Sequence, residues 1–283
     1  MTDRKKIAIV GVGLIGGSMA LQLHEKKLSS RLIGVETDPV HAAKALELEL
    51  VDEILPLETA IDLAEVIILA IPVDRMVNLL PVILNRVKDQ IILDLGSTKS
   101  QLAEAVKHHE KRGRYCATHP MWGTEYSGPA SAVKGAFENK AVIFCNTEQT
   151  DADVLDWVKG MFRKIGMRQL EMEAGAHDLH AAYVSHISHI TSFALANTVL
   201  QKEKEDNAIF ELASAGFEST VRLAKSNPSM WVPIFLQNKE NVLDVLNEHI
   251  EQLKRFRDCI QEEKADELKN LIEEANKIRR IIR

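Results

Sequence analysis

Residues 6–18 read Lys-Ile-Ala-Ile-Val-Gly-Val-Gly-Leu-Ile-Gly-Gly-Ser, an apolar run that leads directly into a cluster of glycines. The run predicts a buried strand over 6–10, and the glycine spacing predicts a tight turn followed by a helix. Gly11 makes the turn, Gly13 lets a ligand pyrophosphate approach the backbone, and Gly16 lets the helix pack against the strand. This stretch therefore indicates an α/β domain that binds a dinucleotide.

A carboxylate follows where a dinucleotide site requires one. Glu36 lies about 20 residues after Gly16, at the end of the next predicted strand, where it is placed to hold the adenosine ribose. The 2′-phosphate of NADP would meet like charge there, so the sequence predicts NAD as the cofactor. Further cofactor contacts are expected from the helix start and from loops after later strands, at Leu14, Ile15, Ile71, Pro72 and Ser97.

Outward from this motif, strand-length and helix-length segments alternate as far as residue 174. Strands are predicted at 6–10, 31–36, 66–71, 90–95, 115–118, 141–145 and 168–172. Several are apolar throughout, as strands buried on both faces of a parallel sheet are. After residue 174 the periodicity becomes helical. The sequence thus predicts an α/β Rossmann-type domain over 1–174 and an all-α domain over 175–283, whose many apolar stripes indicate a homodimer.

Composition narrows the class of partner. The 283 residues include 35 basic and 41 acidic side chains, a net charge of −6 without long blocks of like charge, so neither nucleic acid nor membrane is expected as a partner. Three widely spaced cysteines without metal-site spacing indicate a reducing compartment and no bound metal. The N-terminal apolar run is too short for a signal sequence, so a cytoplasmic protein with a small-molecule substrate is expected.

The segment His119-Pro-Met-Trp-Gly-Thr-Glu-Tyr-Ser-Gly128 follows a predicted strand. Pro120 keeps the preceding residue extended, which predicts the His119 imidazole on a stiff, exposed corner as a candidate acid or base. The alternative is a histidine that only ends the strand. Upstream, Ser97 or Thr98 is expected either to cap a helix N-terminus or to turn its hydroxyl toward a ligand.

The helical part carries a second group of polar candidates. His177 and Asp178 begin a predicted helix on which Ser185 and His189 share one face, either lining a pocket or facing solvent. Farther on, Arg222 lies among apolar residues and requires an anion. That anion is either a substrate carboxylate or an internal partner, for which Glu125 and Glu218 are the candidates.

Together these segments resemble the prephenate/arogenate dehydrogenase family of tyrosine biosynthesis over nearly the full chain. The resemblance is carried by the glycine fingerprint and by the segments 94–99, 119–128, 177–189 and 216–231. It implies that His119 is catalytic, hydrogen-bonding the ring hydroxyl of the substrate, and that Ser97 supports it. It also implies a substrate site made of Arg222, His177, Ser185, His189, Glu125 and Trp231. The chain departs from the family at Trp122, where a small residue is usual, and at Ser188, often proline.

The implied reaction is NAD-dependent oxidative decarboxylation of prephenate, with arogenate as the alternative substrate. The two substrates differ only in a keto or amino group on the side chain. A β-hydroxyacid or imino-acid oxidoreductase shares the domain plan but typically places its base in the helical domain. A catalytically silent NAD-binding regulator is the remaining class, and the presence of Ser97, His119 and Arg222 argues against it. Neither a chorismate mutase nor a regulatory domain is expected.

Overall fold

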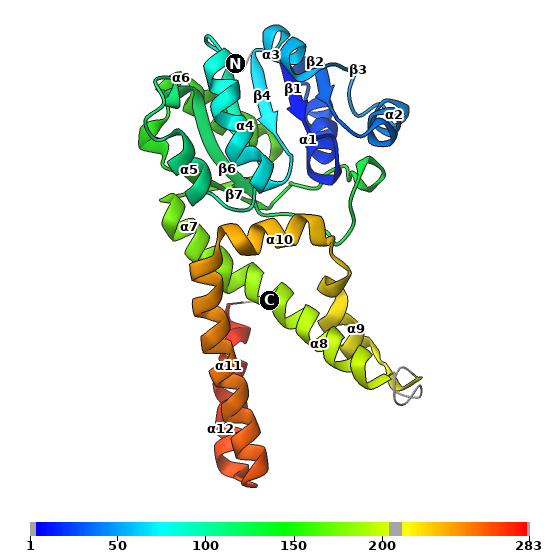
Figure 1. The fold of residues 1–283 in the computed structure, drawn as a ribbon, viewed down its shortest axis with the longest axis vertical. Coiled ribbons are helices and arrows are strands. Elements are labelled where there is room, and N and C mark those ends of the chain that lie inside the picture. Colours follow the sequence, from blue (N-terminus) through cyan, green and yellow to red (C-terminus); the bar gives the residue numbers. More distant parts are fainter. Residues whose placement is uncertain (1–3, 204–210, 282–283) are drawn as a thin grey trace. The chain divides into compact units, whose positions relative to one another are not determined.

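The computed structural model describes residues 4–203 and 211–281. Its first part is built on an eight-stranded sheet of order β3-β2-β1-β4-β5-β6-β7-β8 (Figure 1). The chain leaves β1 toward β2 and β3 on one side and resumes at β4 on the other, so the carboxyl ends of β1 and β4 meet at the point where the strand order reverses. The strands are β1 Lys5–Val10, β2 Ser29–Val35, β3 Glu53–Ile54, β4 Val66–Leu69, β5 Ile91–Asp94, β6 Tyr115–Pro120, β7 Ala141–Cys145 and β8 Arg168–Met172.

The seven strands predicted from sequence are all present, with ends that differ by up to two residues. Two features differ from the prediction. The edge strand β3 has only two residues, too few for a periodic signal. The prediction of a parallel sheet is wrong for β6 and β7, which pair antiparallel, because the segment between them holds only a short 3₁₀ turn and no crossover helix.

Helices cover both faces of the sheet. One buried cluster joins the strands to α1 Leu14–Glu25 and α6 Ala152–Ile165, with a contribution from α2 Pro39–Glu47. The other joins them to α3 Leu57–Leu63, α4 Val73–Arg86 and α5 Ser100–Val106. Alternate residues of β1 enter opposite clusters, Ile7 and Ile9 one, Ala8 and Val10 the other, which explains why this strand is apolar at every position after its two lysines.

The helical segment that follows the sheet stays tightly bound to it. It comprises α7 Ala174–Ala181, a π-helical turn Ala182–His186, α8 Ile187–Glu203, α9 Ala215–Val221 and α10 Pro228–Gln237. Helix α10 packs on α4 (Figure 1). Between these helices, Trp231 and Ile234 share a small core with Val73. The chain consequently divides into compact units after Asn238. The boundary predicted at 174/175 coincides with the end of the sheet and stays a prediction about domains.

The second compact unit, which begins at Lys239, is a helical hairpin over its described residues 239–281. Helices α11 Lys239–Gln261 and α12 Ala265–Asn276 pack against each other, and the three residues between them force the chain to reverse (Figure 1). The antiparallel helix pair predicted there is present. In the described part of the chain, no helix combines the length and the apolar character needed to span a bilayer.

Candidate active site

The glycine loop between β1 and α1 has the geometry expected of a pyrophosphate cradle. Gly11 has a φ of +92°, and a Cβ there would lie 2.7 Å from the carbonyl oxygen of Ala70. A Cβ at Gly16 would lie 1.9 Å from the carbonyl oxygen of Gly11, so only glycine lets the helix approach the turn. By contrast, a Cβ at Gly13 would meet nothing within 4 Å. The backbone at Gly13 is therefore open to a ligand, and the N-terminus of α1 faces the same space.

Glu36, directly after β2, supports this loop from the side. One carboxylate oxygen accepts a hydrogen bond of 3.2 Å from the amide of Val12, and the other accepts from the amides of Thr37 and Asp38. Asp38 in turn caps α2 through the amides of Val40 and His41. The structure thus places a fixed anionic group beside the glycine turn.

A cavity of about 630 Å³ opens beside the glycine loop, a size typical of small-molecule sites. Its wall is made by the start of α1, by the loops after β4, β5 and β6, and by residues of the π-helical turn, α8 and α10. The residues predicted from sequence that line it are Gly13, Leu14, Ile15, Ile71, Pro72, Ser97, His119, Ser185, His189, Arg222 and Trp231. Trp122 also lines it and packs edge-to-face against Phe137, with ring centroids 5.4 Å apart.

His119 lies within β6 rather than on an exposed corner. The strand runs through Pro120, and His119 pairs with Ile143 of β7, because the antiparallel neighbour extends the ladder beyond the predicted strand end. The imidazole is partly buried and reaches the cavity wall. Burial is the main cause that holds the pKa of His119 well below its ordinary value; the charge of Lys99 and the nearby imidazoles of His177 and His186, which disfavour a further protonated ring, lower it more. The ring is therefore neutral at pH 7, as a proton acceptor must be.

His177 does not line the cavity. It is 1% exposed and lies behind His119, with its Nε2 2.8 Å from the Nδ1 of His119 and its own Nδ1 2.8 Å from Oδ1 of Asp178. The substrate contact predicted for His177 is corrected accordingly, because the side chain has no surface to offer a ligand. Sequence reasoning noted Asp178 only as the neighbour of His177 and gave it no role.

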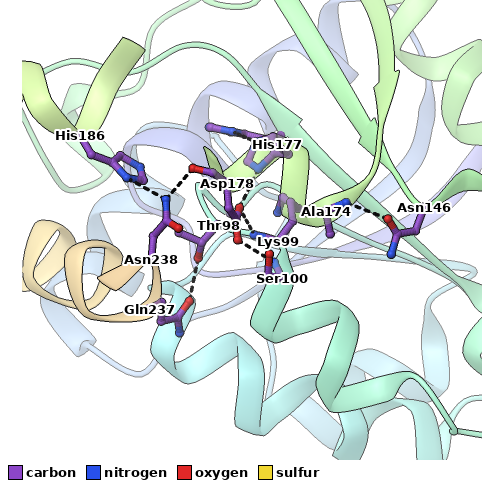
Figure 2. Close-up of polar contacts among 12 residues, drawn as sticks. Thr98, Lys99, Ser100, Asn146, Ala174, His177, Asp178, His186, Gln237 and Asn238 are labelled. Atoms are coloured by element: carbon purple, nitrogen blue, oxygen red, sulfur yellow. Dashed lines mark hydrogen bonds and ion pairs between the residues drawn. The ribbon is translucent and has the colours of Figure 1, made fainter. Parts of the chain in front are cut away.

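The loop that carries Ser97 is held by buried polar groups. Lys99, fully buried, forms an ion pair with Asp94, which also accepts hydrogen bonds from the Tyr115 hydroxyl at 2.7 Å and the Gly96 amide at 2.9 Å. The N-cap predicted at Ser97 or Thr98 is wrong: α5 begins at Ser100. Thr98 instead donates to the Gln237 side chain at 2.7 Å (Figure 2). Ser97 lines the cavity.

The π-helical turn brings the polar residues of the helical segment to the cavity. A turn of this kind is rare and shifts the register of the side chains that follow it. Nδ1 of His189 lies 3.1 Å from the backbone oxygen of Ser185, and the ring stacks on Trp231 with centroids 3.5 Å apart. Burial lowers the pKa of His189. Ser185, His189 and Trp231 therefore form part of the cavity wall. Of the two alternatives that the sequence left for Ser185 and His189, lining a pocket or facing solvent, the structure has the first.

Arg222 has the internal partner that the sequence left open and also reaches the cavity. Its guanidinium donates to Oε2 of Glu125 at 3.0 Å, the internal partner, and its side chain also lines the cavity with about half of its surface exposed. Glu125 itself is outside the wall, with a side chain that is largely covered. The pair places a cation, already oriented by one carboxylate, where a second carboxylate can reach it.

Two family models match nearly all of the chain. The model described as the nucleotide-binding domain of prephenate dehydrogenase matches residues 19–171, and the model described as its dimerization domain matches residues 173–274. A similar protein is the cyclohexadienyl dehydrogenase of Zymomonas mobilis, 30% identical over 285 residues that cover 99% of this chain and 96% of that protein.

Solved structures are similar in fold over nearly the full length of the chain. Prephenate dehydrogenase from Aquifex aeolicus, in complex with hydroxyphenyl propionate and NAD⁺, is 29% identical, with a TM-score of 0.88 and 99% of each chain covered. Arogenate dehydrogenase from Synechocystis is 28% identical, with a TM-score of 0.76, covering 97% of this chain and 98% of that chain. The predicted fold class, a Rossmann-type domain followed by helices, is confirmed.

Proposed function

The chain belongs to the prephenate dehydrogenase family, and on that premise we propose that it catalyses the NAD⁺-dependent oxidative decarboxylation of prephenate to 4-hydroxyphenylpyruvate. The observation that carries the proposal is a cavity bordered together by the glycine loop, by a neutral histidine and by an arginine. These are the parts that the reaction needs: a dinucleotide cradle, a proton acceptor and a group that binds a carboxylate.

The cofactor fits the residues present, since the backbone at Gly13 is open and the N-terminus of α1 faces the cavity. Gly13 and the start of α1 would hold the pyrophosphate, and Glu36 the adenosine ribose. When bound, NAD⁺ supplies the acceptor for the hydride that leaves C4 of the substrate ring. Ile71, Pro72 and Ser97, at the ends of β4 and β5, border the space in which the nicotinamide would lie.

His119 is the proposed base. A neutral imidazole accepts the proton of the C4 hydroxyl as that carbon becomes oxidised, and loss of the ring carboxylate as CO₂ leaves an aromatic ring. Aromatisation makes the overall reaction effectively irreversible. Ser97 is proposed to hold the same hydroxyl in place, since both residues line one cavity.

Arg222 is proposed to bind a carboxylate of the dianionic substrate, with Ser185, His189 and Trp231 completing the wall around the ring. A guanidinium that already donates to one carboxylate has donors left for another. Trp122 narrows the same space with its indole.

The experiment that tests this function compares kcat/KM for prephenate and arogenate, each with NAD⁺ and NADP⁺. We expect NADH, CO₂ and 4-hydroxyphenylpyruvate in equal amounts with prephenate and NAD⁺. A higher kcat/KM with arogenate would assign the alternative substrate. Binding of NAD⁺ without NADH formation from either compound would contradict the proposal and favour the silent regulator.

The same assay tests the cofactor. Glu36 is anchored by three backbone amides and cannot swing away, so the 2′-phosphate of NADP⁺ would meet its charge. We expect kcat/KM to be at least about tenfold higher with NAD⁺ than with NADP⁺. Glu36→Gln should reduce this ratio. Asp38→Asn, which removes a nearby carboxylate that caps α2, is the matched control and should reduce the ratio of the two kcat/KM values less than Glu36→Gln does. Equal use of both cofactors by the unmodified chain would contradict this assignment.

A homodimer is proposed from the helices, in keeping with the dimerization-domain match. Large apolar side chains stand exposed on them, among them Val184, Leu200, Val232, Leu236, Leu253 and Ile260. Exposed apolar surface of this kind is usually covered by another subunit. Sedimentation equilibrium at micromolar concentration should give twice the chain mass of 31.7 kDa. A mass of one chain would contradict the dimer.

A further inference from the structure

Three side chains form a line of hydrogen bonds from the interior to the cavity. Asp178 lies 2.8 Å from Nδ1 of His177, whose Nε2 lies 2.8 Å from Nδ1 of His119. His177 and Asp178 are almost completely buried, and of the three only His119 reaches the cavity wall. The two imidazoles meet nearly edge to face, at 71°, so each presents a ring nitrogen to the other.

The chemistry of the three groups fixes the direction of these bonds. Burial alone would raise the pKa of the Asp178 carboxyl, but hydrogen bonds from His177 and Ser100 together hold it below its usual value. The carboxylate is therefore ionised and can only accept, so Nδ1 of His177 carries the proton. When Nε2 of His177 serves as the acceptor, the proton between the two rings belongs to Nδ1 of His119.

We propose that Asp178 and His177 are positioning residues that hold His119 in the tautomer protonated at Nδ1, which leaves Nε2 as the basic nitrogen for the cavity. In water the opposite tautomer of histidine, protonated at Nε2, is the common one, and it would offer the substrate hydroxyl a donor rather than an acceptor. The line of hydrogen bonds also disperses the charge that His119 gains on taking a proton, because each ring can donate to the acceptor behind it.

Asp178 holds a second part of the site at the same time. Its Oδ1 accepts from the amide of Lys99 and its Oδ2 from the amide of Ser100, both at 2.8 Å, at the beginning of α5 (Figure 2). The side-chain amide of Asn238, at the end of α10, donates to the backbone oxygen of Asp178 at 2.6 Å. One buried residue thus fixes both the orientation of the base and the loop that carries Ser97.

The first test reads the tautomer directly, without substrate. In ¹⁵N NMR of the full chain at neutral pH, the His119 ring should show a protonated Nδ1 and an unprotonated Nε2, assigned by comparison with His119→Asn. Asp178→Ala removes the acceptor that fixes the proton at Nδ1 of His177, so His177 can turn an N–H toward His119, and His119 should shift toward the Nε2-protonated form that is common in water. In His177→Gln, whose side-chain amide can either donate or accept, His119 should show a mixture of its two tautomers. If His119 in the unmodified chain is protonated at Nε2, the proposal is wrong.

The second test measures turnover, and it rests on the proposed dehydrogenase function. We expect kcat to fall roughly 10²-fold in Asp178→Ala and by less in His177→Gln, with KM changed little. His180→Gln, the same substitution at an exposed position of α7, should leave tautomer and kcat unchanged. If Asp178→Ala fails to fold, the tautomer of His119 in the unmodified chain and in His177→Gln still tests the proposal. If His119 is protonated at Nδ1 but the unmodified chain does not turn over substrate, the proposed function is wrong and the line of hydrogen bonds stands. If kcat of His177→Gln is normal, the positioning role is wrong.

Discussion

Replacement of His119 by asparagine should lower kcat by roughly 10²-fold or more while KM for substrate changes little. Asparagine keeps a polar side chain in β6 but cannot take a proton, so the variant loses the base and retains the shape of the cavity wall. Initial rates of NADH formation at saturating substrate measure the effect. His24→Asn, at an exposed position of α1, is the matched control and should be silent.

The pH profile gives the same prediction an independent check. A base whose pKa is lowered stays neutral as the pH falls below the ordinary histidine value of 6.5, so the acidic limb of kcat/KM should lie below pH 6.5. Activity should decline as the pH falls through that limb, because protonation removes the acceptor. In His119→Asn the limb should vanish. Near-normal kcat in the variant, or loss of NAD⁺ binding by the variant, would contradict the catalytic role of His119 and indicate a structural one.

The cofactor half of the site is well predicted from the sequence because its signals are local. Gly11, Gly13 and Gly16 lie within six residues of one another; backbone constraints require glycine at Gly11 and Gly16, and Gly13 leaves the backbone open to a ligand. The predicted end of β6 is wrong for the opposite reason. Whether His119 belongs to the strand depends on β7, more than twenty residues away, and no local pattern reports that pairing.

The line from Asp178 to His119 shows where sequence reasoning stops. His177 and Asp178 are visible in the sequence as polar neighbours at the start of a helix, and polar residues there are more often exposed than buried. Only the packing of α7 against the beginning of α5 places them inside, where the carboxylate takes two backbone amides and an imidazole. A buried carboxylate needs such partners, so the adjacent His-Asp pair is the one available signal.

Replacement of Arg222 by glutamine should raise KM for substrate about 10- to 100-fold, because a hydrogen bond between charged groups contributes roughly 1.5–3 kcal/mol and about 1.4 kcal/mol is tenfold in binding. The loss also frees Glu125, whose carboxylate then repels the dianionic substrate from close to the cavity. Any fall in kcat would report misorientation of the ring relative to His119.

The repulsion can be separated from the lost contact by a double substitution. Glu125→Gln in the Arg222→Gln background removes the unpaired carboxylate, so it should recover part of the KM increase, and the two effects should be non-additive. Lys225→Gln removes the same charge from an exposed position three residues on and should leave KM within about twofold. An unchanged KM in Arg222→Gln would mean that the guanidinium serves Glu125 alone, and the carboxylate of the substrate would then need a different partner in the cavity wall.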